Sequence, residues 1–300
     1  MDQLELFDRP RAAEPSQSAP PVFRETETTV TVSGTDFVYV YDKFGGVFCS
    51  MQAGGTERLQ KPMAYNLFRA PTDNERDVRH QWYGARLDHP VVRVYRTDTA
   101  VLDGQVEIRS ALSIAAVSRQ RSVTLEAVWR IDGEGAVTCH IEAVRNPAMP
   151  WLPRFGLRLF LDNDWEQVCY RGYGPYESYP DKRRASWYGR FETTVRALHE
   201  DYLMPQENGS HWGCREVRIG DGTHGLAVDG PDFCFNASHY TQEELAARQH
   251  NFELQESGYT VLCLDCAQSG VGSHSCGPEL LKPYRFDDEK FTMDLALRWV

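Results

Sequence analysis

The sequence predicts an all-β fold, a large antiparallel sandwich, from three observations. Apolar and polar residues alternate with a period of two over most of the chain, turn-forming Gly, Asp and Asn residues separate the alternating runs, and helical patterns are nearly absent. Only residues 241–248, TQEELAAR, have a helical pattern, and the segment is short. A (β/α)₈ barrel needs ~250 residues with eight helices between its strands, so this chain is not expected to contain one.

The expected strands follow one another from residue 29 to the end of the chain. They are residues 29–34, 37–51 with a central glycine turn, 91–98, 105–117, 122–144 with a DGEG turn, 154–161, 214–230, 232–238, 259–267 and 290–300. Residues 1–23 include a Pro-, Ala- and Ser-rich stretch without periodicity, and we interpret them as a largely disordered linker or remnant of a preceding domain. Residues 24–300 contain no internal repeat and no second linker, which favours one supersandwich domain.

Composition restricts the possible partners and the compartment. The net charge of −11 disfavours nucleic acid and anionic membrane surfaces as partners. The first residues have no basic segment followed by an apolar core, and no run of 18 apolar residues occurs. Eight cysteines without a secretion signal indicate reduced thiols and predict a cytoplasmic protein.

Four irregular stretches between the strands have an unusual composition. Residues 66–77, 172–185, 204–216 and 235–245 mix Pro, Gly, Asn, acidic and aromatic residues, which is typical of ordered loops. Their polar side chains could satisfy backbone groups in tight turns, or they could form a rim that binds sugar hydroxyls beside stacked aromatic rings. The sequence leaves both interpretations open.

Five separated motifs in these and the following residues carry a resemblance to a known family. RAPTDNE, GPYESYPD, PQENG, FNASHYTQEEL and GVGSHSCGP occur in this order, and the chain from residue 25 to 300 resembles the C-terminal domain, or small chain, of the β-galactosidases of glycoside hydrolase family 2. The resemblance implies a galactose-mutarotase-like supersandwich. It also implies β-galactoside hydrolysis, of lactose for example, by the whole enzyme in carbohydrate metabolism.

The same resemblance implies that the catalytic groups lie elsewhere. Retaining hydrolysis uses two glutamates ~5–5.5 Å apart, and in this family both belong to an upstream barrel. The chain alone is therefore expected to be inactive, to contain no catalytic residue and to bind no cofactor, since the family's Mg and Na sites are in that barrel. Its expected partner is the catalytic portion, in the same chain or as a large subunit. DQLEL after Met1 resembles the end of the preceding domain, which predicts a truncated piece, although a natural small subunit is the alternative.

Two segments are expected, by this resemblance, to reach the substrate cleft. Arg76, Asp77, Val78 and Arg79 correspond to a mobile lid loop, although the segment is short and could be a solvated charged turn. His274, Ser275, Cys276 and Gly277 correspond to one wall of the cleft, where Cys276 takes the place of a tryptophan that is found in other members.

The cysteine-rich stretch CLDCAQSGVGSHSCGP is not expected to bind metal. Cys263 and Cys266 are three residues apart on a strand and therefore point to opposite faces, with Leu262, Leu264 and Cys266 on one and Val261, Cys263 and Asp265 on the other. His274 and Cys276, two residues apart in extended chain, are ~6–7 Å apart, too far for the histidine to activate the thiol.

Two other functions remain as alternatives. A stand-alone aldose mutarotase would need a general acid and a base in one cleft, usually His and Glu, and no pattern identifies such a pair. A carbohydrate-binding module would use exposed aromatic residues as its platform. The candidates are Tyr173, Tyr176, Tyr179, Trp187 and Trp212.

Overall fold

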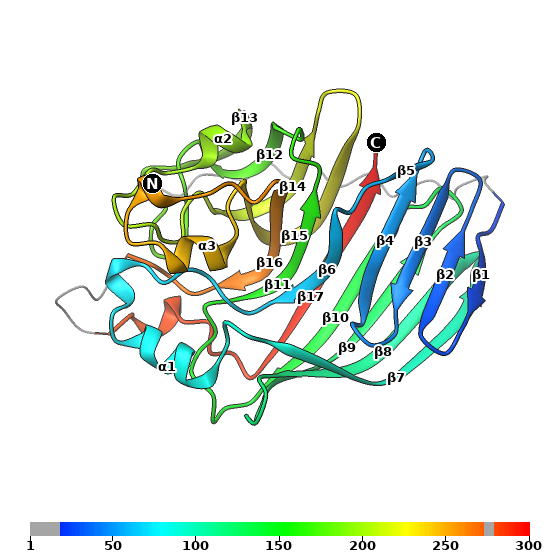
Figure 1. Cartoon of the computed structure of the whole chain (residues 1–300), viewed down its shortest axis with the longest axis horizontal. Helices are drawn as coiled ribbons and strands as arrows, with labels where there is room; N and C mark the ends of the chain where they lie inside the picture. Colours follow the sequence, from blue (N-terminus) through cyan, green and yellow to red (C-terminus); the bar gives the residue numbers. More distant parts are fainter. Residues whose placement is uncertain (1–18, 273–278) are drawn as a thin grey trace.

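A computed structural model describes residues 19–272 and 279–300, which form two antiparallel sheets. The smaller sheet has five strands in sequence order. They are β1 (Val22–Glu25), β2 (Thr29–Ser33), β3 (Phe37–Asp42), β4 (Val47–Ala53) and β5 (Thr56–Glu57). Figure 1 shows this sheet in blue, beside the long strands of the larger one.

The larger sheet has twelve strands and branches at one of them. Its strands are β6 (Lys61–Asn66), β7 (Val91–Leu102), β8 (Gln105–Ala115), β9 (Arg121–Ile131), β10 (Val137–Arg145), β11 (Arg154–Leu161), β12 (Gln167–Gly174), β13 (Trp187–Thr194), β14 (His211–Gly220), β15 (Gly225–Ser238), β16 (Thr260–Gln268) and β17 (Lys290–Trp299). The main path runs β13-β12-β14-β15-β17-β10-β9-β8-β7. The first part of β15 pairs with β17 and its last part pairs with β16, which continues to β11 and β6.

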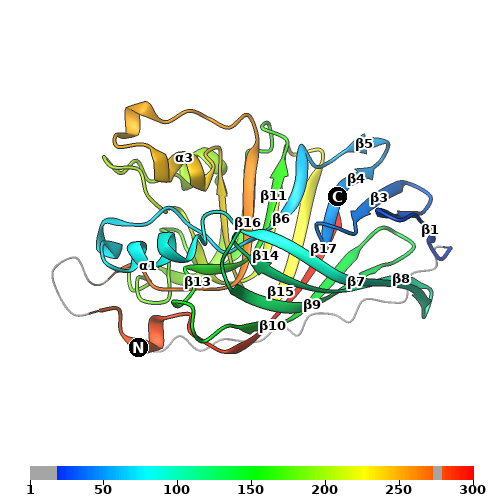
Figure 2. The same ribbon diagram turned by 60° about the horizontal axis from the view of Figure 1, so that its bottom comes forward.

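The two sheets share one hydrophobic core. Tyr41 and Phe48 of the small sheet lie against β8 and β9: the Tyr41 hydroxyl donates to Ser110 Oγ at 2.9 Å, and the Phe48 ring meets Trp129 edge-on at 5.2 Å between centroids. Alternation explains this packing, because β2 buries every second residue, Val30 and Val32, and exposes more of the residues between them. Figure 2 shows the five-stranded sheet standing over the curved strands β7 to β10.

Most strands lie where the alternation predicts them, but the structure adds elements. Strands β1, β5, β6, β12 and β13 were not expected, because β1 and β5 are short and the other three have weak alternation. β12 also includes Gly172–Gly174, which the sequence assigned to an irregular loop.

The helices are more numerous than the sequence predicts. The expected helix exists as α3 (Gln242–Ala247), with the Thr241 side chain accepting from Glu244 N at its start. Two further α-helices are α1 (Val78–Ala85) and α2 (Val195–Leu198), and the 3₁₀ helices are η1 (Asp73–Glu75), η2 (Asn251–Glu253) and η3 (Lys282–Tyr284). Within residues 19–272 and 279–300, no helix has the length and apolar character needed to cross a bilayer.

Candidate functional site

The four irregular stretches of the sequence converge on one another. Glu207 N donates to Ala70 O at 3.0 Å, and Ser178 N donates to Ser210 O at 2.7 Å. The Asn236 amide donates to Asn208 O at 2.5 Å. Residues 66–77, 172–185, 204–216, 235–245 and 268–272 together are called the motif cluster below, and they lie at the end of the molecule that carries the helices (Figure 1).

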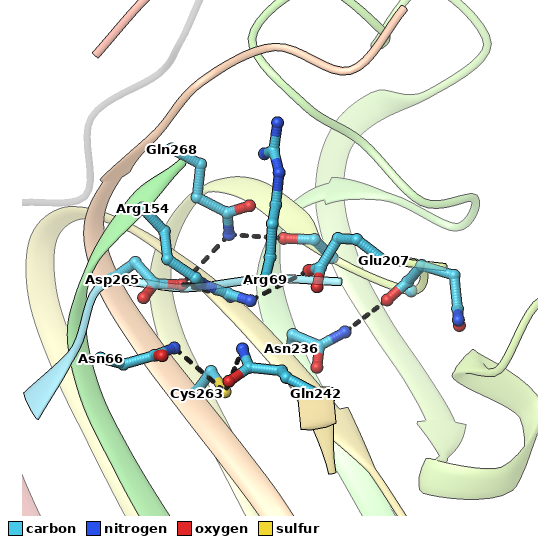
Figure 3. A network of polar contacts seen from close by, with 12 residues as sticks. Asn66, Arg69, Arg154, Glu207, Asn236, Gln242, Cys263, Asp265 and Gln268 are labelled. Carbon is cyan, nitrogen blue, oxygen red and sulfur yellow. Dashed lines mark hydrogen bonds and ion pairs between the residues drawn. The ribbon is translucent and has the colours of Figure 1, made fainter. Parts of the chain in front are cut away.

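Arg154, at the start of β11, is the centre of this cluster. Its side chain is completely buried and donates to Asp265 Oδ2 through Nη2 at 2.5 Å and Nε at 3.1 Å. The same guanidinium reaches Glu207 Oε1 through Nη1 at 3.1 Å, so it joins strand β16 to the PQENG motif (Figure 3). Replacing one of these three residues would leave the others charged and buried without their partner, which strongly destabilises the folded protein.

The electrostatics of this group follow from its burial. Burial alone would lower the pKa of Arg154, but the charges of Asp265 and Glu207 raise it well above its ordinary value. Burial raises the pKa of both carboxyl groups, and the guanidinium opposes that rise. Since Glu207 and Asp265 are both enclosed and held by one arginine, they cannot reach a substrate as an acid and base pair.

A second buried arginine holds the RAPTDNE motif. Arg69 donates through Nη1 to Ser269 O at 2.6 Å and through Nη2 to Gly270 O at 2.9 Å. It also pairs with Glu75, whose other carboxylate oxygen accepts from Thr72 N at 2.8 Å. This arrangement links η1 to the chain that leaves β16.

Asp181, from GPYESYPD, holds the same outgoing chain from the other side. Its two oxygens accept from Val271 N at 2.9 Å and Gly272 N at 2.8 Å. The Asn74 amide donates to Val271 O at 2.9 Å. Two motifs therefore fix the residues that immediately precede 273–278.

Glu177 has a structural partner set of its own. It pairs with Lys182, accepts from the Tyr202 hydroxyl at 2.5 Å, and accepts from Gly209 N at 2.9 Å. Glu177 and Asp181 of GPYESYPD and Glu207 of PQENG thus each hold a neighbouring loop. This arrangement matches the turn-stabilising interpretation of these residues.

The strand with the CxxC spacing has the predicted division into two faces. Leu262 and Leu264 belong to the main core with Cys266 packed against it, whereas Val261 and Cys263 form a separate small cluster with Phe160. The Cys263 sulfur accepts from the Asn66 and Gln242 amides at 3.7 and 3.5 Å (Figure 3). In the part of the chain that the structure describes, no group of three or more His, Cys, Asp or Glu side chains is placed to hold a metal ion.

The predicted lid segment is helical in its second half. Val78 and Arg79 begin α1, Asp77 is its N-terminal cap, and Val78 is buried. Asp77 and Val78 line a cleft of about 20 Å³ together with Gly270 and residues 279–280. Asp77 and Val78 therefore lie close to described residues that precede and follow 273–278 in the sequence.

The predicted cleft wall, His274, Ser275, Cys276 and Gly277, lies outside the described residues. Among the predicted aromatic platform residues, Tyr179 is buried, whereas Tyr176 and Trp187 are exposed. Tyr173 and Trp212 lie against each other at 5.3 Å between ring centroids.

Sequence reasoning missed Arg154 and the role of Asp265. The available signal was that RFGLRLFL carries two charged residues, Arg154 and Arg158, and YTVLCLDCA carries one, Asp265, in strands that are otherwise apolar. A buried charge requires a partner of opposite sign, which marks these three residues as candidates for ion pairs without showing which residues pair.

Comparison with known proteins gives the family to which this chain belongs. The family model of the β-galactosidase small chain matches residues 33–297. The chain belongs to the β-galactosidase small-chain family. This small-chain domain is 38% identical over 99% of its length to a β-galactosidase of Actinobacillus pleuropneumoniae, and 32% identical over 92% to one of Staphylococcus xylosus. It spans 30% and 28% of those two relatives.

The fold of the small-chain domain also agrees with the expected one. The crystal structure of galactose 1-epimerase from Lactobacillus acidophilus NCFM superposes with a TM-score of 0.52 at 11% identity, covering 94% of this chain and 99% of that protein. The galactose-mutarotase-like supersandwich is thereby confirmed as the fold.

Proposed function

We propose that this chain is the non-catalytic part of a retaining β-galactosidase and completes one wall of a substrate cleft formed with a separate catalytic portion. The observation that carries the proposal is that the chain matches the small-chain family over residues 33–297 while spanning only 30% of the A. pleuropneumoniae relative. The catalytic portion, in the same chain or as a large subunit, is the proposed partner. In this proposal the catalytic glutamates and the Mg and Na sites belong to that portion, and this chain binds no cofactor.

The geometry of the motif cluster supports a structural role in the cleft wall. Glu177, Asp181 and Glu207 hold loops, and Asp181 and Asn74 fix the chain that leads into residues 273–278. Asp77 and Val78 of the proposed lid, Arg76–Arg79, line a cleft with Gly270 and residues 279–280. We therefore assign substrate contact to Cys276 and its neighbours, and loop positioning to the carboxylates.

The test is complementation. The purified chain alone should not hydrolyse a chromogenic β-galactoside, and the catalytic portion supplied separately should regain hydrolysis of that substrate and of lactose when the chain is added. Cys276→Trp, measured in the assembled enzyme, should change the Michaelis constant for substrates with different leaving groups. Hydrolysis by the chain alone at rates typical of whole enzymes, about 1–10³ s⁻¹, would contradict the proposal.

The same preparation tests the stand-alone mutarotase alternative. Among the residues that the structure describes, the buried histidines are His211 and His239, and both are poorly suited to acid–base catalysis. Burial lowers the pKa of His211 to about 4, and His239 contacts Glu166 at 2.6 Å within the fold. Polarimetry of freshly dissolved α-galactose should show no acceleration by the chain.

A cytoplasmic location is supported by the seven described cysteines, which are all free thiols.

A further inference from the structure

β13 (Trp187–Thr194) is an edge strand of the larger sheet. It ends the main path of that sheet and, in the part of the chain that the structure describes, pairs only with β12. Its register with β12 has no shift along its whole length, and the strand contains no proline. A regular edge strand presents a row of backbone N–H and C=O groups to a further strand. β13 is therefore able to extend the sheet by one more antiparallel strand.

The strand at the other end of the same path is protected against such pairing. β7 has a register shift between Val94 and Arg96, which is the mark of a β-bulge. A bulge bends and twists an edge strand, so that a straight partner cannot follow it. Of the two strands that end this path, β13 is the one suited to pairing with another strand.

The charges of β13 are complementary to those of a second β13. Arg190 and Glu192 are two residues apart, so they lie on one face of the strand, and their side chains are 72% and 77% exposed. Charged side chains usually discourage pairing at a sheet edge. When two copies of β13 run antiparallel about a two-fold axis at Phe191, however, Arg190 of each copy lies opposite Glu192 of the other. Opposite charges in directly opposite positions stabilise an antiparallel pair.

The neighbouring strand of the same chain does not supply these charges with partners of this kind. On β12, Arg171 lies opposite Arg190, and Cys169 lies opposite Glu192. Arg190 Nε donates to Cys169 Sγ at 3.2 Å, whereas Arg190 Nη2 and Glu192 Oε1 are 3.7 Å apart, beyond hydrogen-bonding distance. Like charges directly opposite each other are destabilising, so a carboxylate on the outer side of Arg190 would be favoured.

The other face of β13 adds apolar surface. Phe191 lies 5.6 Å from Trp187 between ring centroids, and Trp187 is 51% exposed. A two-fold axis at Phe191 would bring two such aromatic pairs together on the same face of the joined sheet. Aromatic pairs across antiparallel strands contribute to the stability of the pairing.

We propose that this chain forms a two-fold symmetric dimer in which β13 pairs antiparallel with β13 of a second copy, centred on Phe191. The larger sheets of the two copies then continue into each other. The inference concerns self-association and goes beyond the proposed function. Because self-association is measured without any hydrolysis, its failure is distinguishable from failure of the proposed function.

Sedimentation velocity of the 300-residue chain over a series of concentrations tests the dimer. Glu192→Arg should weaken dimerisation at least about tenfold, because it replaces two attractive contacts across the axis with two repulsive ones. Combining Arg190→Glu with Glu192→Arg exchanges the two charges, keeps them complementary, and should restore the dissociation constant to within about threefold of the original. The matched control is Asp98→Arg on β7, where Arg96 and Asp98 form a similarly exposed pair at 2.7 Å. This variant should dimerise like the unaltered chain.

Three outcomes would overturn the proposal. The first is a chain that stays monomeric at all concentrations up to about 100 μM. The second is a dimer that Glu192→Arg and Asp98→Arg affect equally. The third is a double variant that keeps the original melting temperature but dimerises no better than Glu192→Arg, which would show that Arg190 and Glu192 do not meet across the axis.

Discussion

At the scale of single residues, the motif cluster depends on charges that are satisfied inside the protein. Arg154 is 0% exposed and contacts two carboxylates, whereas Arg190 and Arg218 pair with glutamates at the surface. The attraction between two buried charges is offset by the loss of their hydration, so the intact pair adds little net stability. Removing one partner, however, leaves a buried charge without a counter-charge and strongly destabilises the fold. The residue scale is therefore where small changes should have large effects.

We expect Arg154→Met to destabilise the chain by about 3–5 kcal/mol, because Asp265 and Glu207 would remain buried together without a counter-charge. The measurement is the free energy of unfolding from urea titrations. Arg218→Met is the matched control, since its pair with Glu216 at 2.7 Å is exposed, and such pairs contribute about 0–1 kcal/mol. Equal effects of the two variants would show that the buried group is not a critical contact.

His211 predicts how stability depends on pH. Burial lowers the pKa of His211 to about 4, while an unfolded histidine titrates near ~6.5. Between these two pH values, His211 is protonated in the unfolded chain but neutral in the folded one. Its neutral form therefore contributes fully to the free energy of unfolding above pH ~6.5, and up to ~3 kcal/mol of that stability is lost as the pH falls towards 4. His211→Phe, which keeps a ring against Tyr170 and Phe235, should flatten the slope in this window. The measurement is the free energy of unfolding of both proteins as a function of pH. Between pH 7 and 8.5 the slopes of the two curves should coincide, whereas parallel curves at pH 4.5–6.5 would show that His211 does not cause the pH dependence.

At the scale of elements, the alternation of apolar and polar residues predicted the long strands and the two faces of β16. Successive side chains of a strand point to opposite faces, so the order of residue types shows directly which face is buried. The alternation missed β12 and β13, whose residues Gly172, Gly174 and Gly189 dilute the pattern. α1 was missed because VRHQWYGA buries only Val78 and Trp82, which is too short a stripe to recognise. The partners of Arg154 could not be derived, since the pairing of β11 with β16 joins residues more than a hundred positions apart.

Gly270 tests the contact between Asp181 and the chain that leaves β16. A Cβ at Gly270 would lie 2.4 Å from the Asp181 carboxyl carbon, so Gly270→Ala must displace the carboxylate from Val271 N and Gly272 N. We expect a loss of about 2 kcal/mol or more in unfolding free energy, because hydrogen bonds to a charged group are broken. Gly84→Ala is the control: it lies in α1 with nothing within 4 Å of its Cβ, and should stabilise by about 0.5–1 kcal/mol. An unchanged unfolding free energy in the Gly270→Ala variant would mean that Asp181 does not hold the chain that leaves β16.

At the scale of the whole molecule, two adjacent surface segments expose large apolar side chains. Leu203 is 82% exposed and Phe252 is 81% exposed, and Asn251 N donates to Leu203 O at 3.0 Å, which places the segments side by side. Large exposed apolar side chains that lie together indicate an interaction surface. Their position next to PQENG, at residues 205–209, connects this surface to the motif cluster.

This surface predicts where the proposed catalytic portion binds. Leu203→Asp with Phe252→Asp would bury charges in that interface, and hot-spot side chains typically contribute about 2 kcal/mol or more, so association should weaken by at least ~30-fold. The measurement is the concentration of chain that restores half of the hydrolytic activity in complementation. Val117→Asp, at a 79% exposed residue in the β8–β9 connection, is the control and should complement like the unaltered chain. Unchanged complementation by the double variant, with an unchanged melting temperature, would place the interface on another face and leave these two residues as ordinary surface side chains.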